Sequence, residues 1–377
     1  MKNTRHYLDN SATTSLDARV IFAMHQFEKK YYGNPSSIHR EGQEARARID
    51  FARASIAQFF GAKSQEIIYT SGATESNNLA IQGVVDYHLR HKKTRPHIIT
   101  TELEHHSVYN VVKQLKARGA VEATFVKPNR NGLITPDKIL KNVRTNTVLI
   151  SVIFVSNEIG SVLPIREIGK LLTIHNSQLK SKVLFHTDAV QAVKFYNCNV
   201  DKLGVDLLTF SAHKIHGPKG IGGLFVKTGT KLEALMHGGS QEYDLRPGTQ
   251  NTIGIIGMAK AYELLGSLDD RQKNAEKIKK IQKLFLTSLL KNNRVILNGP
   301  TGDDRAPDNL SVSIKGIDSD TLIAKLDLAG IAASTGSACV SGSTEPSHVI
   351  KALGKPDRRA AVLRLSLDID SKFVKIL

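Results

Sequence analysis

Short apolar runs alternate with amphipathic helical patterns over the first two thirds of the chain. The runs lie at residues 66–70, 97–101, 148–155, 183–188, 206–211 and 222–226, and the segments between them have helical spacing. This alternation is typical of a mostly parallel sheet with helices on both faces. Ligands bind such sheets where strands end and loops begin. The pattern therefore predicts an α/β domain with a ligand site at one edge of its sheet.

The last third of the chain has a different pattern. From about residue 261 to 293, apolar residues recur at helical spacing among many lysines, which predicts one long amphipathic helix that bridges two domains. Short strands are expected at 294–297, 310–314 and 362–367, with helices at 319–328 and 346–353. We therefore expect a large domain at 15–260 and a smaller α+β domain formed by 1–14 and 261–377.

Composition favours a globular protein that does not enter a membrane. The chain has 377 residues, of which 41% are hydrophobic and 23% charged, so it can bury a sizeable core. Its apolar runs are too short to span a bilayer, and residues 1–9 are charged rather than signal-like, so we expect a cytoplasmic location. The formal charge is +17, but no basic run is interleaved with aromatic residues. Direct nucleic-acid binding is therefore not expected, and a solvated basic surface is favoured.

The chain has two cysteines, Cys198 and Cys339, which argues against a disulfide framework. No cysteine pair or HExxH helix accompanies the 14 histidines, so the sequence does not predict a zinc site. Cys339 lies within a run of small residues, Ala333 to Thr344, that favours an exposed and reactive thiol. Cys198 has no such setting and is interpreted as structural.

Three polar segments follow predicted strands. In the first, Tyr69 to Asn78, a strand runs through Gly72 into a helix expected to begin near Thr74. Free backbone N–H groups at such a turn can bind a phosphate, although a well-capped turn alone has the same pattern. In the second, Asp188 ends an apolar strand. A buried acid there needs a partner such as a protonated pyridine nitrogen, but it could equally cap the next helix.

The third segment, Phe210 to Gly220, places Lys214 directly after a strand and between Ser211, His213 and further basic residues. An apolar pocket that contains other cations favours the neutral amine, which is the form that reacts with an aldehyde cofactor. This segment, coming after the other two, favours a pyridoxal-phosphate enzyme with Lys214 as the cofactor lysine.

Taken together, these segments resemble the NifS/IscS-type cysteine desulfurases, in the class V aminotransferase group of fold-type I pyridoxal-phosphate enzymes. The resemblance runs from Tyr7 to about Leu367. It includes the motifs Gly33-Asn-Pro-Ser-Ser37, Asn157-Glu-Ile-Gly160, Arg246-Pro-Gly-Thr249 and Glu345-Pro-Ser-His348. The long segment around Cys339 is similar to the long-loop branch of this family. The fold it implies is that of fold-type I pyridoxal-phosphate transferases, with a mostly parallel mixed sheet in the large domain.

The resemblance implies how the cofactor, pyridoxal 5'-phosphate, would be held. Lys214 would carry it, Asp188 would keep its ring nitrogen protonated, and His105 would stack on its ring, whereas His106 is assigned to structure. Its phosphate would be cradled by Ala73, Thr74, Ser211 and His213, with Thr249 reaching across from the second subunit of a homodimer. Asn157 and Gln191 would contact the ring oxygen and the substrate side.

The resemblance also implies the reaction. Arg364 would clamp the carboxylate of L-cysteine. Lys214 would move the α-proton, assisted by His105, and the Cys339 thiolate would attack the substrate sulfur. Alanine and a persulfide on Cys339 would result, and the persulfide would pass to a sulfur acceptor, either an iron–sulfur scaffold or a tRNA-thiolating enzyme.

Two departures from the family pattern lie near the end of the chain. Asp368 replaces a usual glycine, and we expect its charge close to the Arg364 clamp. Family members generally continue with a further helix, so apolar surface is expected to be exposed here unless a partner subunit or a rearranged tail covers it.

Two alternatives stay open from the sequence. One is another class V enzyme, an aminotransferase or selenocysteine lyase, which would not need the Cys339 thiol. The other is a non-catalytic docking protein for sulfur carriers, suggested by the basic charge and the short tail.

Overall fold

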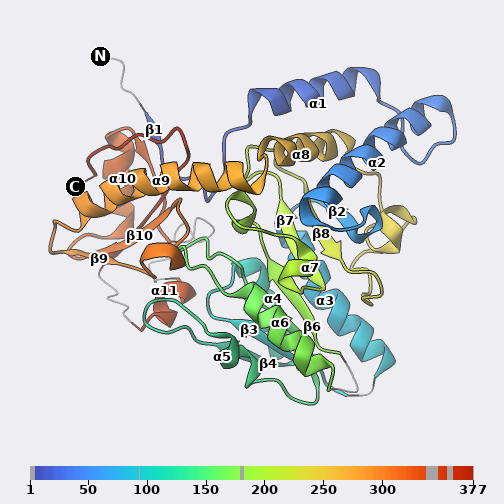
Figure 1. Cartoon of the computed structure of the whole chain (residues 1–377), viewed down its shortest axis with the longest axis horizontal. Coiled ribbons are helices and arrows are strands. Elements are labelled where there is room, and N and C mark those ends of the chain that lie inside the picture. Colours follow the sequence, from blue (N-terminus) through green and yellow to red (C-terminus); the bar gives the residue numbers. More distant parts are fainter. Residues whose placement is uncertain (1–4, 93, 179–181, 337–346, 355–359, 377) are drawn as a thin grey trace.

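The computed structural model describes residues 5–92, 94–178, 182–336, 347–354 and 360–376. A seven-stranded sheet forms its centre (Figure 1), in the order β2-β8-β7-β6-β5-β3-β4. The strands are β2 (Ile67–Thr70), β3 (His97–Thr101), β4 (Glu122–Val126), β5 (Thr147–Ser151), β6 (Leu184–Asp188), β7 (Leu207–Ser211) and β8 (Gly222–Val226). β8 is antiparallel to both neighbours, whereas β4, β3, β5, β6 and β7 are mutually parallel. The predicted mostly parallel mixed sheet is therefore confirmed.

The strand predictions differ from the structure mainly at the sheet edge and in one long run. Strands were expected at 97–101 and 222–226 and have those bounds, but β4 was missed. Its sequence, EATFV, is only partly buried because it forms an edge strand, so it lacks a continuous apolar run. The predicted strand at 148–155 ends at Ser151, and the following apolar residues form a buried loop.

Helices cover both faces of the sheet because successive strand residues point to opposite sides. Ile67, Ile99, Ile150 and Leu208 face a core shared with α2 (Arg40–Phe60), α6 (Ile165–Asn176) and α8 (Thr252–Leu264). Their neighbours Ile68, Ile98, Leu149 and Leu207 face a second core, against α3 (Ala73–His91) and α4 (His106–Ala117). The remaining helices of this part are α1 (Ala18–Lys30), α5 (Pro136–Leu140) and α7 (Val200–Leu203), with short 3-10 turns at Ser64–Glu66, Ala192–Lys194 and Gln241–Asp244.

The long helix predicted at 261–293 is wrong as a single element. The chain forms α8 and then α9 (Leu268–Leu289), separated at Gly266, whose φ is +71°. Ser267 caps α9, and Ser267 and Asp270 form a reciprocal capping box that fixes the new start. Figure 1 shows α9 running from α8 to the side of the smaller sheets.

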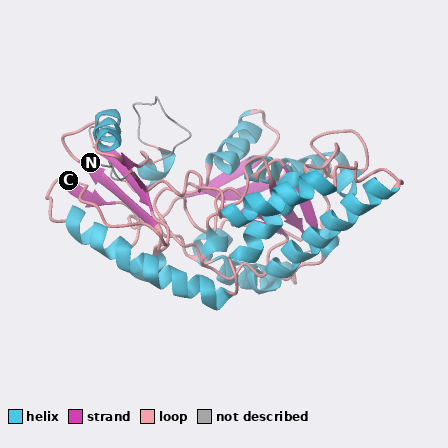
Figure 2. Ribbon diagram, turned by 90° about the horizontal axis from the view of Figure 1, so that it is seen from above, coloured by secondary structure: helices cyan, strands magenta, loops and turns pink. Residues whose placement is uncertain are grey.

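The smaller sheets lie at the far end of α9, as Figure 2 shows from above. One contains β9 (Val295–Leu297), β10 (Asn309–Ile314) and β12 (Ala361–Ser366), in the order β12-β10-β9, and the other pairs β1 (His6–Tyr7) with β11 (Ile331–Ala332). Helices α10 (Ser319–Leu328) and α11 (His348–Ala352) and a 3-10 turn at Gly302–Asp304 complete this part. The domain boundary predicted at residue 260 stays a prediction; it falls within α8.

The end of the described chain packs on the smaller core. The Phe373 ring lies 5.1 Å from that of Phe285, and Val374 and Ile376 contact the same apolar cluster. An extended tail therefore covers part of the surface that the sequence led us to expect exposed. No helix among the described residues is both long and apolar enough to cross a membrane.

Candidate active site

A cavity of about 550 Å³ lies at the edge of the large sheet where the parallel strands end. Strands β2, β3, β5, β6 and β7 all terminate toward it, so residues far apart in sequence meet there. Ten of the twelve predicted site residues line it: Ala73, Thr74, His105, Asn157, Asp188, Gln191, Ser211, His213, Lys214 and Arg364. Of the other two, Thr249 is exposed and outside this lining, and Cys339 lies outside the described residues.

One end of the cavity is built to receive an anion. Helix α3 begins there at Ala73, and its N-cap residue Gly72 offers no side chain to the free N–H groups. A β-carbon on Gly222 would lie 2.8 Å from the Gly72 backbone, so β8 can pack against this turn only with glycine at 222, whereas Gly72 is favoured by its φ of +154°. The Ser211 hydroxyl is buried and has no hydrogen-bond partner among the described residues. These unsatisfied donors suit a phosphate group.

Asp188 forms the opposite end. Its side chain is 5% exposed and accepts hydrogen bonds from the Asn77 amide at 2.8 Å and the Val190 N–H at 3.0 Å. Burial raises the pKa of Asp188, which those hydrogen bonds and Lys214 partly offset. A cation beside this carboxylate, such as a protonated pyridine nitrogen, would compensate the cost of burial.

A hydrogen-bond chain joins Asp188 to His105. The Asn77 amide also donates to Ser107 Oγ at 2.8 Å, and Ser107 Oγ lies 2.7 Å from His105 Nδ1. The Ser107 N–H donates to the same Nδ1, so this nitrogen accepts and Nε2 carries the ring proton. Burial and nearby Lys214 lower the pKa of His105 to about 4, which keeps it neutral at neutral pH.

Asn77 and Ser107 were missed as site residues by the sequence analysis. The signal available was spacing, because Asn77 lies four residues after Ala73 on α3 and so on the same helix face. Ser107 directly follows the two histidines at the start of α4.

Replacing Asn77 with alanine is expected to lower kcat/KM for L-cysteine about tenfold, because Asp188 would lose a charge-assisted hydrogen bond. It should also shift the pH dependence of the visible absorption of the holoenzyme, which a purely structural loss would not move. The matched control is Asn78→Ala, since the Asn78 amide donates only to the Thr74 carbonyl of its own helix. An Asn77→Ala protein with the wild-type pH profile would contradict the role in positioning Asp188.

Lys214 lies in the loop after β7, where the N-terminal segment passes over it. Its Nζ donates to the Ala12 carbonyl at 2.6 Å and to the Ser11 carbonyl. The Thr14 N–H bonds the His213 carbonyl at 3.0 Å, which ties this segment to the lysine loop. Carbonyl oxygens thus hold the amine inside the cavity, close to both Asp188 and His105.

Arg364 comes from the middle of β12 and is 1% exposed. Its guanidinium pairs with Asp9 at 2.9 Å and donates to the Gly336 carbonyl at 3.0 Å. Asp9 also accepts from the Ser334 hydroxyl at 2.6 Å. Asp9, like Asn77 and Ser107, is a site residue that was not predicted from the sequence.

Asp368 does not contact Arg364, contrary to the expectation from sequence. Its carboxylate pairs with His216 Nε2 at 2.9 Å, two residues beyond Lys214. The hydrogen bond and charge of Asp368 raise the pKa of His216, and His216 lowers that of Asp368. His216 also has a positive φ of 61°, so the pair fixes the turn of the lysine loop.

The pair predicts a pH-dependent stability. The raised His216 pKa stabilises the fold below about pH 6.5, and this is lost as pH rises through the folded pKa. The lowered Asp368 pKa stabilises above about pH 3.9 and is lost as pH falls through its folded value. Asp368→Asn should therefore lower the free energy of unfolding by about 1 kcal/mol near pH 5.5 and by less at pH 8.5. Urea unfolding with exposed Asp370→Asn as control tests this, and a pH-independent difference would refute it.

The residues around the cavity fit one cofactor. An anion site at a helix N-terminus, a buried aspartate opposite it and a lysine between them match the phosphate, ring nitrogen and aldehyde of pyridoxal phosphate. This fold and site define the pyridoxal-phosphate-dependent transferases of fold type I.

Known proteins agree with that class. The family model for aminotransferase class-V matches residues 6–376. The cysteine desulfurase IscS of Dictyoglomus turgidum is 46% identical over 351 residues, which cover 93% of this chain and 86% of that protein. Among solved structures, a NifS-like protein superposes with a TM-score of 0.89 at 33% identity, covering 99% of this chain and 96% of its own. SspA in complex with cysteine superposes with a TM-score of 0.82 at 33% identity, covering 97% and 100%.

The chain belongs to the aminotransferase class-V family and, within it, to the NifS/IscS-type cysteine desulfurases. The predicted resemblance, fold class and cofactor are thereby confirmed.

Proposed function

We propose that this cysteine desulfurase converts L-cysteine to L-alanine, forms a persulfide on Cys339 and passes that sulfur to acceptor proteins. The observation that carries the proposal is the placing of Lys214, Asp188, His105 and Arg364 around one cavity. The relatives named cysteine desulfurase support the reaction, and the neighbour bound to cysteine supports the substrate.

Arg364 is the residue we assign to the substrate carboxylate. Its Nε is buried and has no hydrogen-bond partner among the described residues, and its pairing with Asp9 fixes the plane of the guanidinium. A carboxylate can exchange with the weaker carbonyl contacts and gain a charge-assisted pair. This would orient the α-carbon of L-cysteine toward Lys214.

Lys214 is the residue we assign to proton transfer at the α-carbon. The bound cofactor supplies an acceptor for the electrons that the departing proton leaves behind. His105 is neutral and carries its proton on Nε2, so it can pack on an aromatic ring without a charge and can donate a hydrogen bond. Asp188 would hold the cofactor ring nitrogen protonated, and Ala73, Thr74, Ser211 and His213 would hold its phosphate.

Sulfur transfer completes the reaction. The Cys339 thiolate attacks the substrate sulfur, an S–S bond forms as the C–S bond breaks, and the carbon product takes up a proton to become L-alanine. One L-cysteine and one enzyme thiol thus become one L-alanine and one persulfide. We infer that the acceptor is an iron–sulfur scaffold or a tRNA-thiolating enzyme.

A homodimer in the cytoplasm is part of the proposal. Helices α1 and α2 and the segment between them expose five large apolar side chains: Ile21, Phe22, Tyr32, Ile38 and Phe51. A second copy would cover such a surface, and it would bring its own Thr249 to the phosphate site. Light scattering after gel filtration should give twice the chain mass of 41.4 kDa.

The proposed reaction is tested by a single turnover without reductant. L-Cysteine should yield equal amounts of L-alanine and protein-bound sulfur, and peptide mapping should place one extra sulfur atom on the peptide that carries Cys339. Alanine without bound sulfur, or sulfur on Cys198, would contradict the proposed function.

A further inference from the structure

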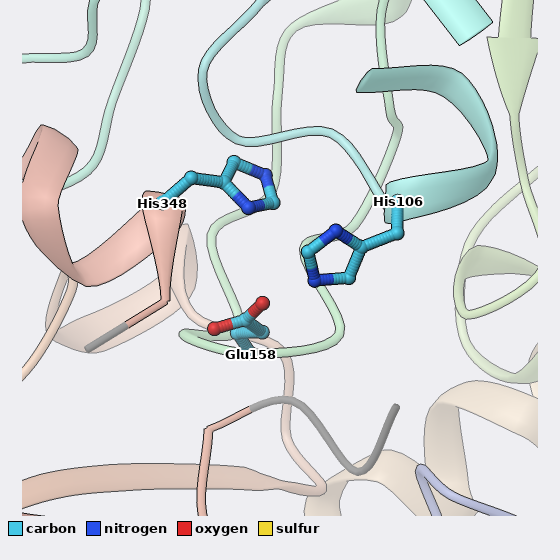
Figure 3. A group of neighbouring side chains, drawn as sticks. All are labelled: His106, Glu158 and His348. Carbon is cyan, nitrogen blue, oxygen red and sulfur yellow. The ribbon is translucent and has the colours of Figure 1, made fainter. Parts of the chain in front are cut away.

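Three potential metal ligands converge beside the active site. Within the part of the chain that the structure describes, His106, Glu158 and His348 form one group whose ligand atoms lie within 4.8 Å of one another. Figure 3 shows the side chains pointing toward a common space, His106 from α4, His348 from α11 and Glu158 from the loop after β5. None of them lines the cofactor cavity.

His348 is prepared to act as a ligand. Its Nε2 lies 2.9 Å from the Glu104 carbonyl, which can only accept, so Nε2 carries the proton. Nδ1 therefore has a free lone pair, and it is buried with no hydrogen-bond partner among the described residues. The ring is held by stacking on Tyr109, with centroids 4.1 Å apart. A metal-binding histidine almost always donates its other N–H to a carbonyl or carboxylate in this way.

His106 shows the same arrangement. Its side chain hydrogen-bonds with Asn110, one helical turn further along α4, whereas its Nε2 is buried and unpartnered in the described structure. The centroids of the His106 and His348 rings are 4.8 Å apart. Burial lowers the pKa of both histidines, so the imidazoles are neutral, which is the form that binds metal.

Glu158 supplies the carboxylate, and burial raises its pKa. Its side chain is 2% exposed, and one carboxylate oxygen accepts from the Ser347 hydroxyl at 2.5 Å. An ionised carboxylate so deeply buried is costly without a cation. A divalent ion between the carboxylate and the two free lone pairs would satisfy all three groups.

We propose that His106, Glu158 and His348 form a binding site for a divalent transition-metal ion of the zinc class. Two imidazoles and one carboxylate are a ligand set that zinc uses when a fourth position is open. Ligand atoms around a tetrahedral zinc ion lie about 3.3 Å apart, so small side-chain rotations would close the present spacing. The ligands come from positions 106, 158 and 348, and this explains why no local zinc motif marks them in the sequence.

Such an ion would join α4, the Asn157–Gly160 turn and α11. Ser347, which bonds Glu158, immediately precedes α11, and a β-carbon on Gly336 would lie 3.3 Å from a Glu158 carboxylate oxygen. Through the hydrogen bond between Ser347 and Glu158, the metal would fix the start of α11 against the large sheet. We expect it to stabilise the docking of α11 and to raise the melting temperature of the holoenzyme.

The test is metal binding by the untagged holoenzyme after treatment with a chelator. Zn²⁺ added and then removed by gel filtration should remain at one ion per chain, and Co²⁺ should give visible bands of a low-coordinate site. Glu158→Gln and His348→Asn, which keep side-chain shape, should each weaken Zn²⁺ binding at least about 100-fold, because a protein ligand is lost. His25→Asn, at an exposed position of α1, is the matched control and should bind as wild type.

Three results would overturn the proposal. They are binding of less than one ion per chain, binding that persists in both ligand variants, and binding that is lost in Cys339→Ser, whose thiol is not among the proposed ligands. The visible cofactor absorption and the melting temperature of each variant report whether it is folded. Because the readout is metal content and Co²⁺ absorption, the outcome is independent of desulfurase activity.

Discussion

Replacing Lys214 with alanine is expected to leave the purified protein without its yellow colour and to lower kcat/KM for L-cysteine at least about 10⁴-fold. Two functions would be lost together, because this amine both holds the cofactor and moves the α-proton. The geometry supports this, since Lys214 Nζ lies in the cavity between the anion site and Asp188, held by the Ala12 carbonyl. Absorption spectra and alanine release measure the two effects separately.

The matched control is Lys202→Ala, an exposed lysine on α7, which should keep colour and activity. Added methylamine provides a second test, because a small amine can replace a missing proton carrier but cannot restore a covalent anchor. A Lys214→Ala protein that stays yellow after dialysis and turns over L-cysteine would rule out Lys214 as the cofactor lysine.

The sheet and its ligand edge could be predicted because they depend on local pattern. Strands that are buried on both faces appear in the sequence as short apolar runs. The polar residues that follow them lie at one edge of the sheet, because parallel strands all end at the same edge. Asp188, Ser211 and Lys214 could therefore be assigned to one site without knowing how the strands are ordered. Strand β4 could not be predicted in this way, because a half-buried edge strand has no apolar run.

The supporting contacts could not be predicted because they join residues that are distant in sequence. Asp9 meets Arg364 across 355 residues, and Asn77 meets Asp188 across 111. Asp368 lies close to Arg364 in the sequence, but the two side chains do not meet in the structure. In the fold, β12 ends at Ser366, so Asp368 lies beyond the strand that carries Arg364, and it meets His216 instead. The group formed by His106, Glu158 and His348 could not be predicted for the same reason, because its members are distant in sequence and meet only in the fold.

Two buried carboxyl groups near the site, Glu104 and Asp188, have different surroundings. Burial raises the pKa of Glu104 to about 8, and its side chain accepts from the Thr101 hydroxyl and the Ile153 N–H. A neutral Glu104 leaves Asp188 as the acid that a cofactor cation would pair with. The two carboxyl groups differ in what surrounds them. The hydrogen bond from the Asn77 amide and the nearby charge of Lys214 favour the ionised form of Asp188.

Replacing Cys339 with serine is expected to abolish protein-bound persulfide and to reduce sulfur transfer to an acceptor protein at least about 10³-fold, because a hydroxyl cannot attack the substrate sulfur as a thiolate does. The cofactor should stay bound, since none of the residues assigned to it is changed. The visible spectrum should therefore still change when L-cysteine is added, which separates this variant from Lys214→Ala.

The other cysteine cannot take over the reaction. Cys198 is 2% exposed, and burial raises its pKa to about 12, so at neutral pH almost none of it is a thiolate. Cys198→Ala should accordingly keep both persulfide formation and sulfur transfer, and it serves as the matched control. Persulfide labelling of the two variants after one turnover with L-cysteine distinguishes the thiols. Labelling that survives in Cys339→Ser and disappears in Cys198→Ala would reverse the assignment, because a thiol so deeply buried could react only if the fold opened around it.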